Sequence, residues 1–350
     1  MRHIVITLLI LTALAAHGSP AHAQPLPDRI RAAVRDRVET LHTGSYQQGR
    51  EEQIDRQTKT VKIGAGGELT LANIAGDIVV TRANGGEATI EIVKTARART
   101  VEDARDQLGL VTVSVTERAG RADVKTVYPR DDETGRNNRR NVNVSVGYTV
   151  SAPAGTRLTI ASVSGSIKVS DIKGDLSANS ISGGVRIANG GRIAAAKSVS
   201  GNVEIVDTET DGAVDVQSIS GSVVLRKVTA RRVDVGSISG SVVVQDVQCD
   251  RIEAHSISGS VEFAGTLAKG GRYELTSHSG DVRIAVSGAT GFEIEANSFS
   301  GSVRSDLALT LQGDRGRDGS GRRAVRGVFG DGSAVLNVTT FSGNVVVTRR

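Results

Sequence analysis

Serine is the residue whose spacing in this sequence most suggests chemistry, because it recurs in a short motif, Ser-x-Ser-Gly-x-Val. The clearest copies begin at Ser218, Ser237 and Ser256, and variants begin at Ser162, Ser180, Ser198, Ser277, Ser298 and Thr340. A serine hydroxyl becomes a nucleophile only beside a base such as histidine. The repeat supplies serines everywhere, and no Gly-x-Ser-x-Gly, P-loop or dinucleotide fingerprint occurs. The sequence therefore assigns no catalytic serine.

Histidine and cysteine offer few candidates for acid–base, nucleophilic or metal chemistry. His255 and His278 are the only histidines beyond residue 42, and they lack the spacing of metal ligands. His278 fills the motif position that is Ile or Val in earlier coils, so we expect a partly buried core or corner residue; a ligand or pH-switch role is the alternative. Cys249 is the only cysteine, which excludes an intramolecular disulfide and favours a solitary turn residue over a nucleophile.

Carboxylates are the groups that a β-helix enzyme acting on acidic polysaccharides would use. The candidates, mainly at outward strand positions and in turns, are Glu204, Asp207, Glu209, Asp211, Asp215, Asp234, Asp246 and Asp250. Two of them on adjacent rungs would form a catalytic pair, although any charged solenoid brings two carboxylates together. Asp314, Asp318 and Asp331 lack the spacing of a calcium loop. The sequence predicts neither a metal nor a cofactor.

A basic segment, Gln312 to Ser333, replaces one motif copy. It carries arginines among glycines, at Arg315, Arg317, Arg322, Arg323 and Arg326. One interpretation is a loop that contacts an anionic envelope polymer or another partner. The other is a flexible loop extruded from the repeats.

The spacing of the motif predicts the architecture. Its glycines are Gly165, Gly183, Gly201, Gly221, Gly240, Gly259, Gly280, Gly301 and Gly343, about 20 residues apart except for a last gap close to two periods. A fixed period of about 20 with strand patterning is typical of a solenoid. We therefore expect an all-β fold, a single-stranded β-solenoid (parallel β-helix) of about 20 residues per coil, with the final coil closing the stack.

Side-chain alternation predicts which motif residues face the core. Ile219, Gly221, Val223 and Leu225 share one parity and are expected to point inward, with Ser220 and Ser222 outward. The same holds for the coils of Ile238 and Ile257. Val214 and Val216 have the opposite parity, so a corner lies at the first serine, where stacked serines would satisfy their hydroxyls between neighbouring coils.

The position after each motif glycine forms a second outward stripe. Its residues are Ser166, Gly184, Asn202, Ser222, Ser241, Ser260, Asp281, Ser302 and Asn344. This stripe is nearly neutral. It is either a hydrogen-bonding surface or a plain solvated face.

Four segments are expected along the chain. Residues 1–23 form a signal peptide with an apolar stretch and an Ala-x-Ala site, which predicts a periplasmic or secreted protein with no stable transmembrane segment after cleavage. Residues 24–60 read as a polar linker with a short amphipathic helix. Residues 61–155 are irregular β coils with a helical turn at Val101–Leu110, and residues 156–350 are the regular repeats.

Composition narrows the partners. The formal net charge is +5, with 43 Lys and Arg against 38 Asp and Glu interleaved along the chain. This pattern is a mildly basic surface rather than a nucleic-acid-binding tract. Only 3% of the residues are aromatic, so the core must be built mainly from Val, Ile, Leu and Ala, and platforms for sugar rings are scarce.

Together, these features resemble a known group. A signal peptide, an early Asn73-Ile74-Ala75-Gly76-Asp77-Ile78 copy, a Val-x-Val-x-Tyr-x-Val strand before Pro153-Ala154-Gly155, and serial Ser-x-Ser-Gly-x-Val coils are all present. The chain resembles the bacterial putative-adhesin family of β-solenoid domains of unknown function, the LiaG-like type. The resemblance implies an exported envelope protein and supplies no catalytic residues.

Three functions remain open at this point. The first is a non-enzymatic structural or adhesin-like interaction module of the cell envelope, with an unknown envelope polymer or protein as partner. The second is an envelope-stress sensor or signalling partner that binds through the N-terminal helix or the arginine segment. The third is a polysaccharide-active β-helix enzyme.

Overall fold

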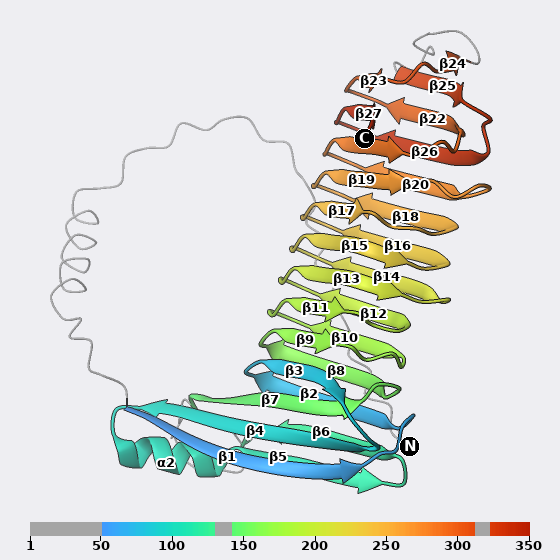
Figure 1. The fold of residues 1–350 in the computed structure, drawn as a ribbon. Coiled ribbons are helices and arrows are strands. Elements are labelled where there is room, and N and C mark those ends of the chain that lie inside the picture. The colour runs from blue at the N-terminus through green and yellow to red at the C-terminus, as the bar shows by residue number, and fades with distance from the viewer. Residues whose placement is uncertain (1–50, 130–141, 312–322) are drawn as a thin grey trace, which may run out of the picture. The chain divides into compact units, whose positions relative to one another are not determined.

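Two stacked sheets form the body of the protein. The computed structural model describes residues 51–129, 142–311 and 323–350, and Figure 1 shows the strands rising as a ladder above a broad base. Sheet A contains, in spatial order, β1 (Glu51–Lys62), β4 (Glu87–Ala98), β7 (Val144–Pro153), β3 (Ile78–Ala83), β9 (Ile167–Ser170), β11 (Val185–Ala188), β13 (Val203–Glu209), β15 (Val223–Thr229), β17 (Val242–Gln245), β19 (Val261–Thr266), β21 (Val282–Ser287), β27 (Val345–Arg349) and β23 (Val303–Ser305). Sheet B contains β24 (Thr310–Leu311), β25 (Arg323–Phe329), β22 (Phe292–Ser298), β26 (Ala334–Thr340), β20 (Arg272–Ser277), β18 (Arg251–Ser256), β16 (Arg232–Ser237), β14 (Ala213–Ser218), β12 (Ile193–Ser198), β10 (Leu176–Ser180), β8 (Arg157–Ser164), β2 (Glu68–Ala75), β6 (Arg121–Val127) and β5 (Thr112–Arg118).

The regular coils run from β8 to β21 and confirm the predicted parallel β-solenoid. Successive strands alternate between the sheets, and each pairs in parallel with the strand one coil away, as Val223 does with Val242. The core between the sheets is narrow. Val214 and Val216 from sheet B meet Val223 and Leu225 from sheet A, and all four are fully buried. Branched aliphatic side chains fill this thin layer without large rings.

The motif is the corner between the sheets, as predicted, but the register within it differs. Ser218 ends β14 and Val223 begins β15, with a bend between them. Ile219 is 43% exposed, whereas Ser218 is 4% exposed. The prediction that Ile219, Ile238 and Ile257 point inward is therefore wrong. The first two inward residues of the motif, Ser218 and Gly221, are three positions apart, because the bend breaks the strand alternation.

Backbone hydrogen bonds explain why a serine is buried at the corner. The Ser218 hydroxyl donates to the carbonyl oxygen of Gly201 in the preceding coil (2.9 Å) and accepts from the Gly221 amide of its own coil (3.0 Å). Ser237 and Ser256 repeat both bonds. The hydroxyls are therefore satisfied between neighbouring coils, as predicted, and their partners are glycine backbone groups rather than other serines.

The motif glycine is required by the close approach of two coils. A Cβ atom added to Gly221 would lie 2.1 Å from the carbonyl oxygen of Gly201, and the same clash recurs at Gly240 and Gly259. Backbone cannot move away as a flexible side chain can. The inward position predicted for the glycine is thus confirmed, and the space beside it is filled by the neighbouring coil.

The base of the solenoid is more irregular. β1 pairs antiparallel with β4, and β4 with β7, so the part of the predicted linker from residue 51 to 60 is a strand. The rest of that linker and its helix lie outside the described residues. The expected helical turn is the α-helix α2 (Val101–Leu110), whose first turn is capped by the Thr100 hydroxyl accepting from the Asp103 amide.

The C-terminal coil does not close the stack. β26 and β27, which hold the last motif copy, are inserted between the coil of β20 and β21 and the coil of β22 and β23. Gly343 accordingly lies between Gly280 and Gly301. The end of sheet B is instead covered by β25, which pairs antiparallel with β22 and β24. An earlier part of the chain therefore leaves a gap that the final coil fills.

Candidate functional site

The residues singled out for catalysis do not assemble into a reactive site. Burial raises the pKa of Cys249 to about 12, so its thiol stays protonated and unreactive at neutral pH. No group of three or more His, Cys, Asp or Glu among the described residues has metal-binding geometry. His278 is exposed rather than partly buried, and its ring stacks on Phe341 with centroids 4.9 Å apart.

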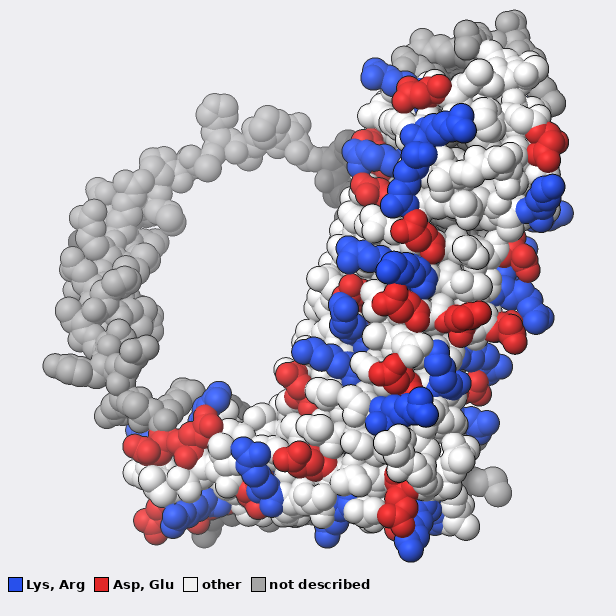
Figure 2. All heavy atoms as spheres, in the orientation of Figure 1, with Lys and Arg blue, Asp and Glu red and all other residues white. Residues whose placement is uncertain are grey.

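Carboxylates do stack on sheet B. Asp215, Asp234, Glu253 and Glu274 occupy one register position on four successive strands. Asp215 lies 2.8 Å from the Lys197 ammonium group, and Glu253 is bound by two arginines, chiefly Arg251, which lower its pKa. Figure 2 shows the same interleaving of acidic and basic side chains along the visible face. The pKa of Glu253 thus moves away from the raised value that a general acid needs.

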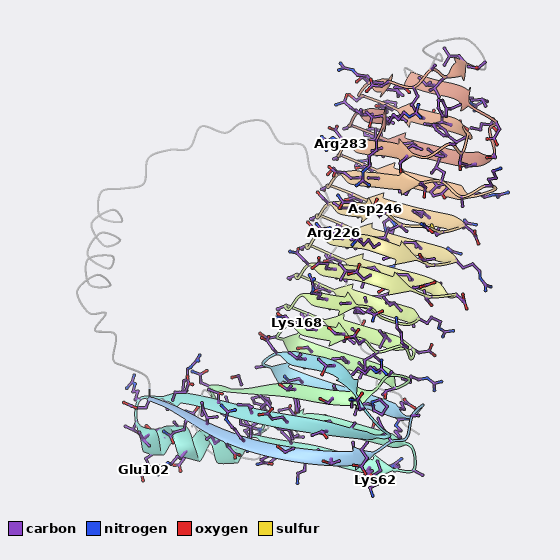
Figure 3. All side chains as sticks on the ribbon, viewed as in Figure 1. Lys62, Glu102, Lys168, Arg226, Asp246 and Arg283 are labelled. Carbon is purple, nitrogen blue, oxygen red and sulfur yellow. The ribbon has the colours of Figure 1, made fainter. Side chains whose placement is uncertain are left out.

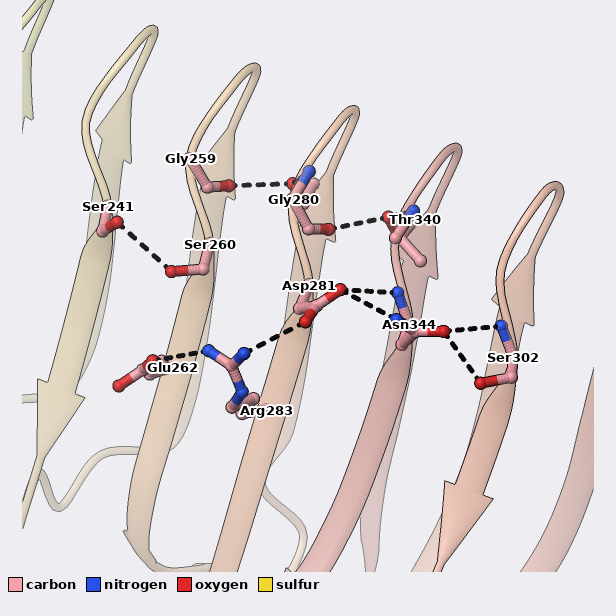
Figure 4. A network of polar contacts seen from close by, with 12 residues as sticks. Ser241, Gly259, Ser260, Glu262, Gly280, Asp281, Arg283, Ser302, Thr340 and Asn344 are labelled. Carbon is pink, nitrogen blue, oxygen red and sulfur yellow. Dashed lines mark hydrogen bonds and ion pairs between the residues drawn. The ribbon is translucent and has the colours of Figure 1, made fainter.

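The nearly neutral stripe bonds to itself. The Ser260 hydroxyl donates to the Ser241 hydroxyl (3.2 Å), and the Asn344 amide donates to Asp281 (2.9 Å), as Figure 4 shows. Asn344 in turn accepts from both the backbone amide and the hydroxyl of Ser302. These side chains join neighbouring coils, which leaves less of the stripe free for a ligand.

Part of the arginine segment forms a strand. Arg323 and Arg326 belong to β25, the strand that covers the end of sheet B, and Arg326 forms an ion pair with Glu295 at 2.8 Å. Arg315, Arg317 and Arg322 lie outside the described residues. A deletion of Gln312–Gly327 would therefore remove much of β25.

One surface that the sequence interpretation placed in the core is exposed. The second residue of every motif copy projects outward at the corner, and these residues form a continuous line that we call the apolar ridge. In spatial order they are Ile74, Val163, Ile181, Val199, Ile219, Ile238, Ile257, His278, Phe341 and Phe299. The aliphatic and phenylalanine side chains are between 39% and 49% exposed. Soluble proteins rarely display so many apolar side chains in one line unless the surface contacts something.

The ridge is held rigidly by the backbone. The Ile219 amide donates to the Ser198 carbonyl (3.1 Å), and the Ile219 carbonyl accepts from the Ser239 amide (2.8 Å). The same two bonds recur from coil to coil, for example at Val199 and Ile238. At the upper end the rings of Phe299 and Phe341 stack with centroids 4.7 Å apart. The ridge is thus a preformed surface with its side chains at the rung spacing of about 4.8 Å.

A groove of about 760 Å³ runs beside the ridge, and we call it the motif groove. One wall is the ridge from Ile74 to Ile238. The other wall is a column of sheet B residues at one register position. Seven of them directly precede the first residue of a motif copy, and Lys125 holds the same position on β6. In register order they are Lys125, Ala72, Ala161, Asn179, Lys197, Gln217, Gly236 and His255. Their small or flexible side chains leave the groove open to solvent.

Particular residues define the two ends of the groove. At the upper end, the His255 ring covers Gly236: a Cβ atom added to that glycine would lie 2.2 Å from His255 Nε2. At the lower end, Asn73 takes the place of the first motif serine and donates to the Val146 carbonyl (2.8 Å). The Thr126 hydroxyl donates to Asn73 and bonds to the Tyr148 hydroxyl. This buried network fixes β6, which carries Lys125.

The comparisons with known proteins identify the family of this chain. The family model described as Toastrack DUF4097 matches residues 68–348. The chain belongs to this family. It is an adhesin-like family of domains of unknown function. Comparison with curated proteins found no relative.

The search of solved structures found bacterial proteins with low sequence identity to this chain. A "putative adhesin" from Parabacteroides merdae is 11% identical, covers 84% of this chain and 96% of its own, and has a TM-score of 0.43. Similar structures described as "putative adhesin" from Bacteroides fragilis (14% identical, covering 85% and 97%) and Parabacteroides distasonis (10% identical, also 85% and 97%) each have a TM-score of 0.40. Within the described part of the chain, no helix is long and apolar enough to cross a membrane.

Proposed function

We propose that this Toastrack protein is an exported, non-enzymatic, adhesin-like interaction module of the cell envelope, and that it contacts its partner through the apolar ridge. The observation that carries the proposal is the ridge itself. Nine large apolar side chains from Ile74 to Phe299 are at least 39% exposed along one corner of the solenoid. The sequence supports export through the signal peptide predicted at residues 1–23, and hence a periplasmic or secreted location.

Folding alone does not require this exposure. The repeated geometry of the corner depends on Ser218 and Gly221, which bond or pack against the preceding coil. Between them, Ile219 directs its side chain away from the core. A polar residue there would remove apolar surface from water at no cost in core packing. A binding role explains why apolar residues occupy this position in coil after coil.

Retention on intact envelopes tests the proposal. We expect the wild-type protein to bind, and the double variant Ile219→Asp with Ile238→Asp to lose most of this retention. The control is Ser220→Asp with Ser239→Asp, which adds the same charge one position away on side chains that are also exposed. Equal retention of the two double variants would contradict the ridge as the contact surface.

The non-enzymatic part of the proposal has a separate test. Incubation with uronate polymers should release no new reducing or unsaturated ends. The strongest enzymatic alternative uses adjacent carboxylates, and Asp234 lies next to Asp215 and Glu253. Release of such ends by the wild type, abolished by Asp234→Asn, would establish an enzyme instead.

A further inference from the structure

The motif groove admits only a narrow occupant. A ridge residue and the wall residue of the same coil are two positions apart, which is about 7 Å along an extended chain. An α-helix with its side chains is about 10–12 Å across. The lining strands run from β6 to β18, and eight rungs about 4.8 Å apart give a length of about 34 Å. The shape therefore suits one extended chain lying along the solenoid axis.

A polypeptide is a poor occupant of this groove. The backbone amides and carbonyls beside the ridge already bond between coils, as Ile219 does with Ser198 and Ser239. An extended peptide along the axis would find no ladder to join, and its own amide groups would lose water without a partner. A glycan is disfavoured for a related reason, because the groove offers its hydroxyls few side-chain partners, chiefly the amides of Asn179 and Gln217.

A hydrocarbon chain meets no such cost. The ridge wall is aliphatic, and at the lower end the opposite wall is Ala72 and Ala161. These small residues leave room opposite Ile74 and Val163. Burial of methylene groups against such surface is favourable by about 0.8 kcal/mol for each group. Since half of a bilayer core is about 15 Å thick, a single acyl chain would occupy about half of the groove.

The charged residues of the groove favour its lower end as the site of an anionic head group. Among the residues that line the groove there is no carboxylate, and the two lysines are Lys125 and Lys197. Lys197 is neutralised by Asp215 at 2.8 Å. Lys125 is exposed and forms no ion pair with any residue of the described ranges. It stands at the lower end, beside the alanines, where it would meet an anionic head group.

We propose that the motif groove binds a single-chain anionic lipid, with its head group at Lys125 and its acyl chain along Ile74, Val163, Ile181 and Val199. The inference rests on the proposed function, because it names the occupant of the same surface. The groove holds one chain and leaves one side of it open to solvent. This fits a single acyl chain better than a two-chain lipid.

Calorimetric titration with palmitate tests the position of the chain. We expect saturable binding with one lipid per protein, and a loss of about tenfold in affinity for Ile181→Asp. The matched control is Ile257→Asp, which has the same motif position and the same exposure of 49% but lies outside the groove lining. Its affinity should stay within about twofold of wild type. Equal losses in the two variants, or no saturable binding to wild type, would overturn the inference.

Titration with methyl palmitate tests the head group. Lys125→Gln should weaken palmitate binding by about tenfold, as expected for a charge-assisted hydrogen bond, and should leave binding of the uncharged ester unchanged. Lys168→Gln is the control, because Lys168 is exposed on β9 of sheet A (Figure 3) and is not among the residues that line the groove. An equal effect of Lys125→Gln on acid and ester would refute the assigned orientation.

Two further measurements separate this inference from the proposed function and from other occupants. Envelope retention that depends on Ile219 and Ile238, without palmitate binding, would support the adhesin-like role and refute the lipid site. Palmitate binding without such retention would support the lipid site and refute the adhesin-like role. Association with anionic two-chain vesicles that palmitate does not displace would identify a membrane surface instead. A dimer in sedimentation that Ile181→Asp dissociates would identify a second copy of the chain.

Discussion

The two long edges of the solenoid solve the same turning problem in different ways. At the motif edge, the chain passes from sheet B to sheet A through Ser-x-Ser-Gly, with a buried serine, a tightly packed glycine and an exposed apolar side chain. At the opposite edge, which we call the return edge, it passes from sheet A back to sheet B, and in five coils the chain near this edge contains a non-glycine residue at positive φ. These residues are Asp171, Asn189, Asp207, Lys227 and Asp246, with φ between 50° and 61°.

The return edge is polar. Asn189 donates to Asp171 at 2.6 Å, the Lys227 ammonium group lies 3.8 Å from Asp207, and Arg350 bonds to Asp246. Asp and Asn adopt positive φ more readily than most residues. Figure 3 labels Asp246 and the nearby Arg226 on this side of sheet A. A turn in this fold can therefore be built with a charged, solvated exterior, so the apolar ridge is a property of one edge and not of the solenoid.

The largest expected effect on stability lies in the core between the two edges. Val242→Asp places a charge at a fully buried position between stacked coils, and we expect a loss of more than about 4 kcal/mol in unfolding free energy. Ser241→Asp, one residue earlier at a half-buried outward position, should cost less than about 1 kcal/mol. Chemical denaturation of both variants gives the difference. Similar losses would contradict the assigned register.

Glycine replacement should distinguish the edges next. Gly221→Ala at the motif edge forces a methyl group against the Gly201 carbonyl oxygen, and we expect a loss of about 3 kcal/mol. Gly212→Ala at the return edge meets the Cγ and Cδ atoms of the half-exposed Arg192 side chain at 2.8 Å and the Thr210 hydroxyl at 3.5 Å, but no backbone atom. That side chain can swing aside, so the cost should stay below about 1 kcal/mol. Thermal and denaturant unfolding measure both losses. Equal losses for the two substitutions would contradict the difference between the edges.

Serine replacement separates the two serines of one motif. Ser218→Ala leaves the Gly201 carbonyl and the Gly221 amide without their shared partner, and we expect a loss of about 2 kcal/mol. Ser220→Ala alters an exposed side chain and should change stability by less than about 0.5 kcal/mol. Both are measured by equilibrium denaturation. A neutral Ser218→Ala would remove the structural role given to the first serine.

The smallest expected effect lies at the return edge. Lys227 has φ of 52°, a conformation that disfavours lysine more than asparagine. Lys227→Asn should therefore stabilise the protein by up to about 1 kcal/mol, because the exposed contact with Asp207 contributes little. Lys168→Asn, within strand β9, is the control and should be neutral or slightly destabilising. Destabilisation by Lys227→Asn would mean that its ion pair outweighs the backbone strain.

The period of the sequence was sufficient to predict the fold, because the stacked glycines tolerate no other residue where two coils meet. The side-chain register was only half predictable. Simple alternation carried through the motif places Ile219 inside, but the bend after Ser218 breaks the alternation. A signal was present: Ser218 shares its parity with Val214 and Val216, both fully buried. A serine in line with core valines indicates an inward hydroxyl with backbone partners.

The two ends were harder to predict because their partners are distant in sequence. The gap of about two periods before Gly343 gave no indication that the last coil lies between Gly280 and Gly301. The strand β25 was hidden in a segment rich in glycine and arginine. The charged strand β1 read as a linker since only its pairing with β4 makes it a strand. The ridge was not predicted because the register placed its residues in the core. The groove beside it was not predicted for the same reason.

The central claim is that two adjacent residues of one motif have different roles: the first serine stabilises the fold, and the apolar residue after it binds the partner. It is tested by measuring melting temperature and envelope retention together for Ser218→Ala and for the pair Ile219→Asp with Ile238→Asp. We predict that Ser218→Ala lowers the melting temperature while the folded protein keeps its retention. We predict that the isoleucine variant keeps its melting temperature and loses its retention. A variant pair in which stability and retention fall together, or in which the isoleucine variant is still retained, would contradict the account.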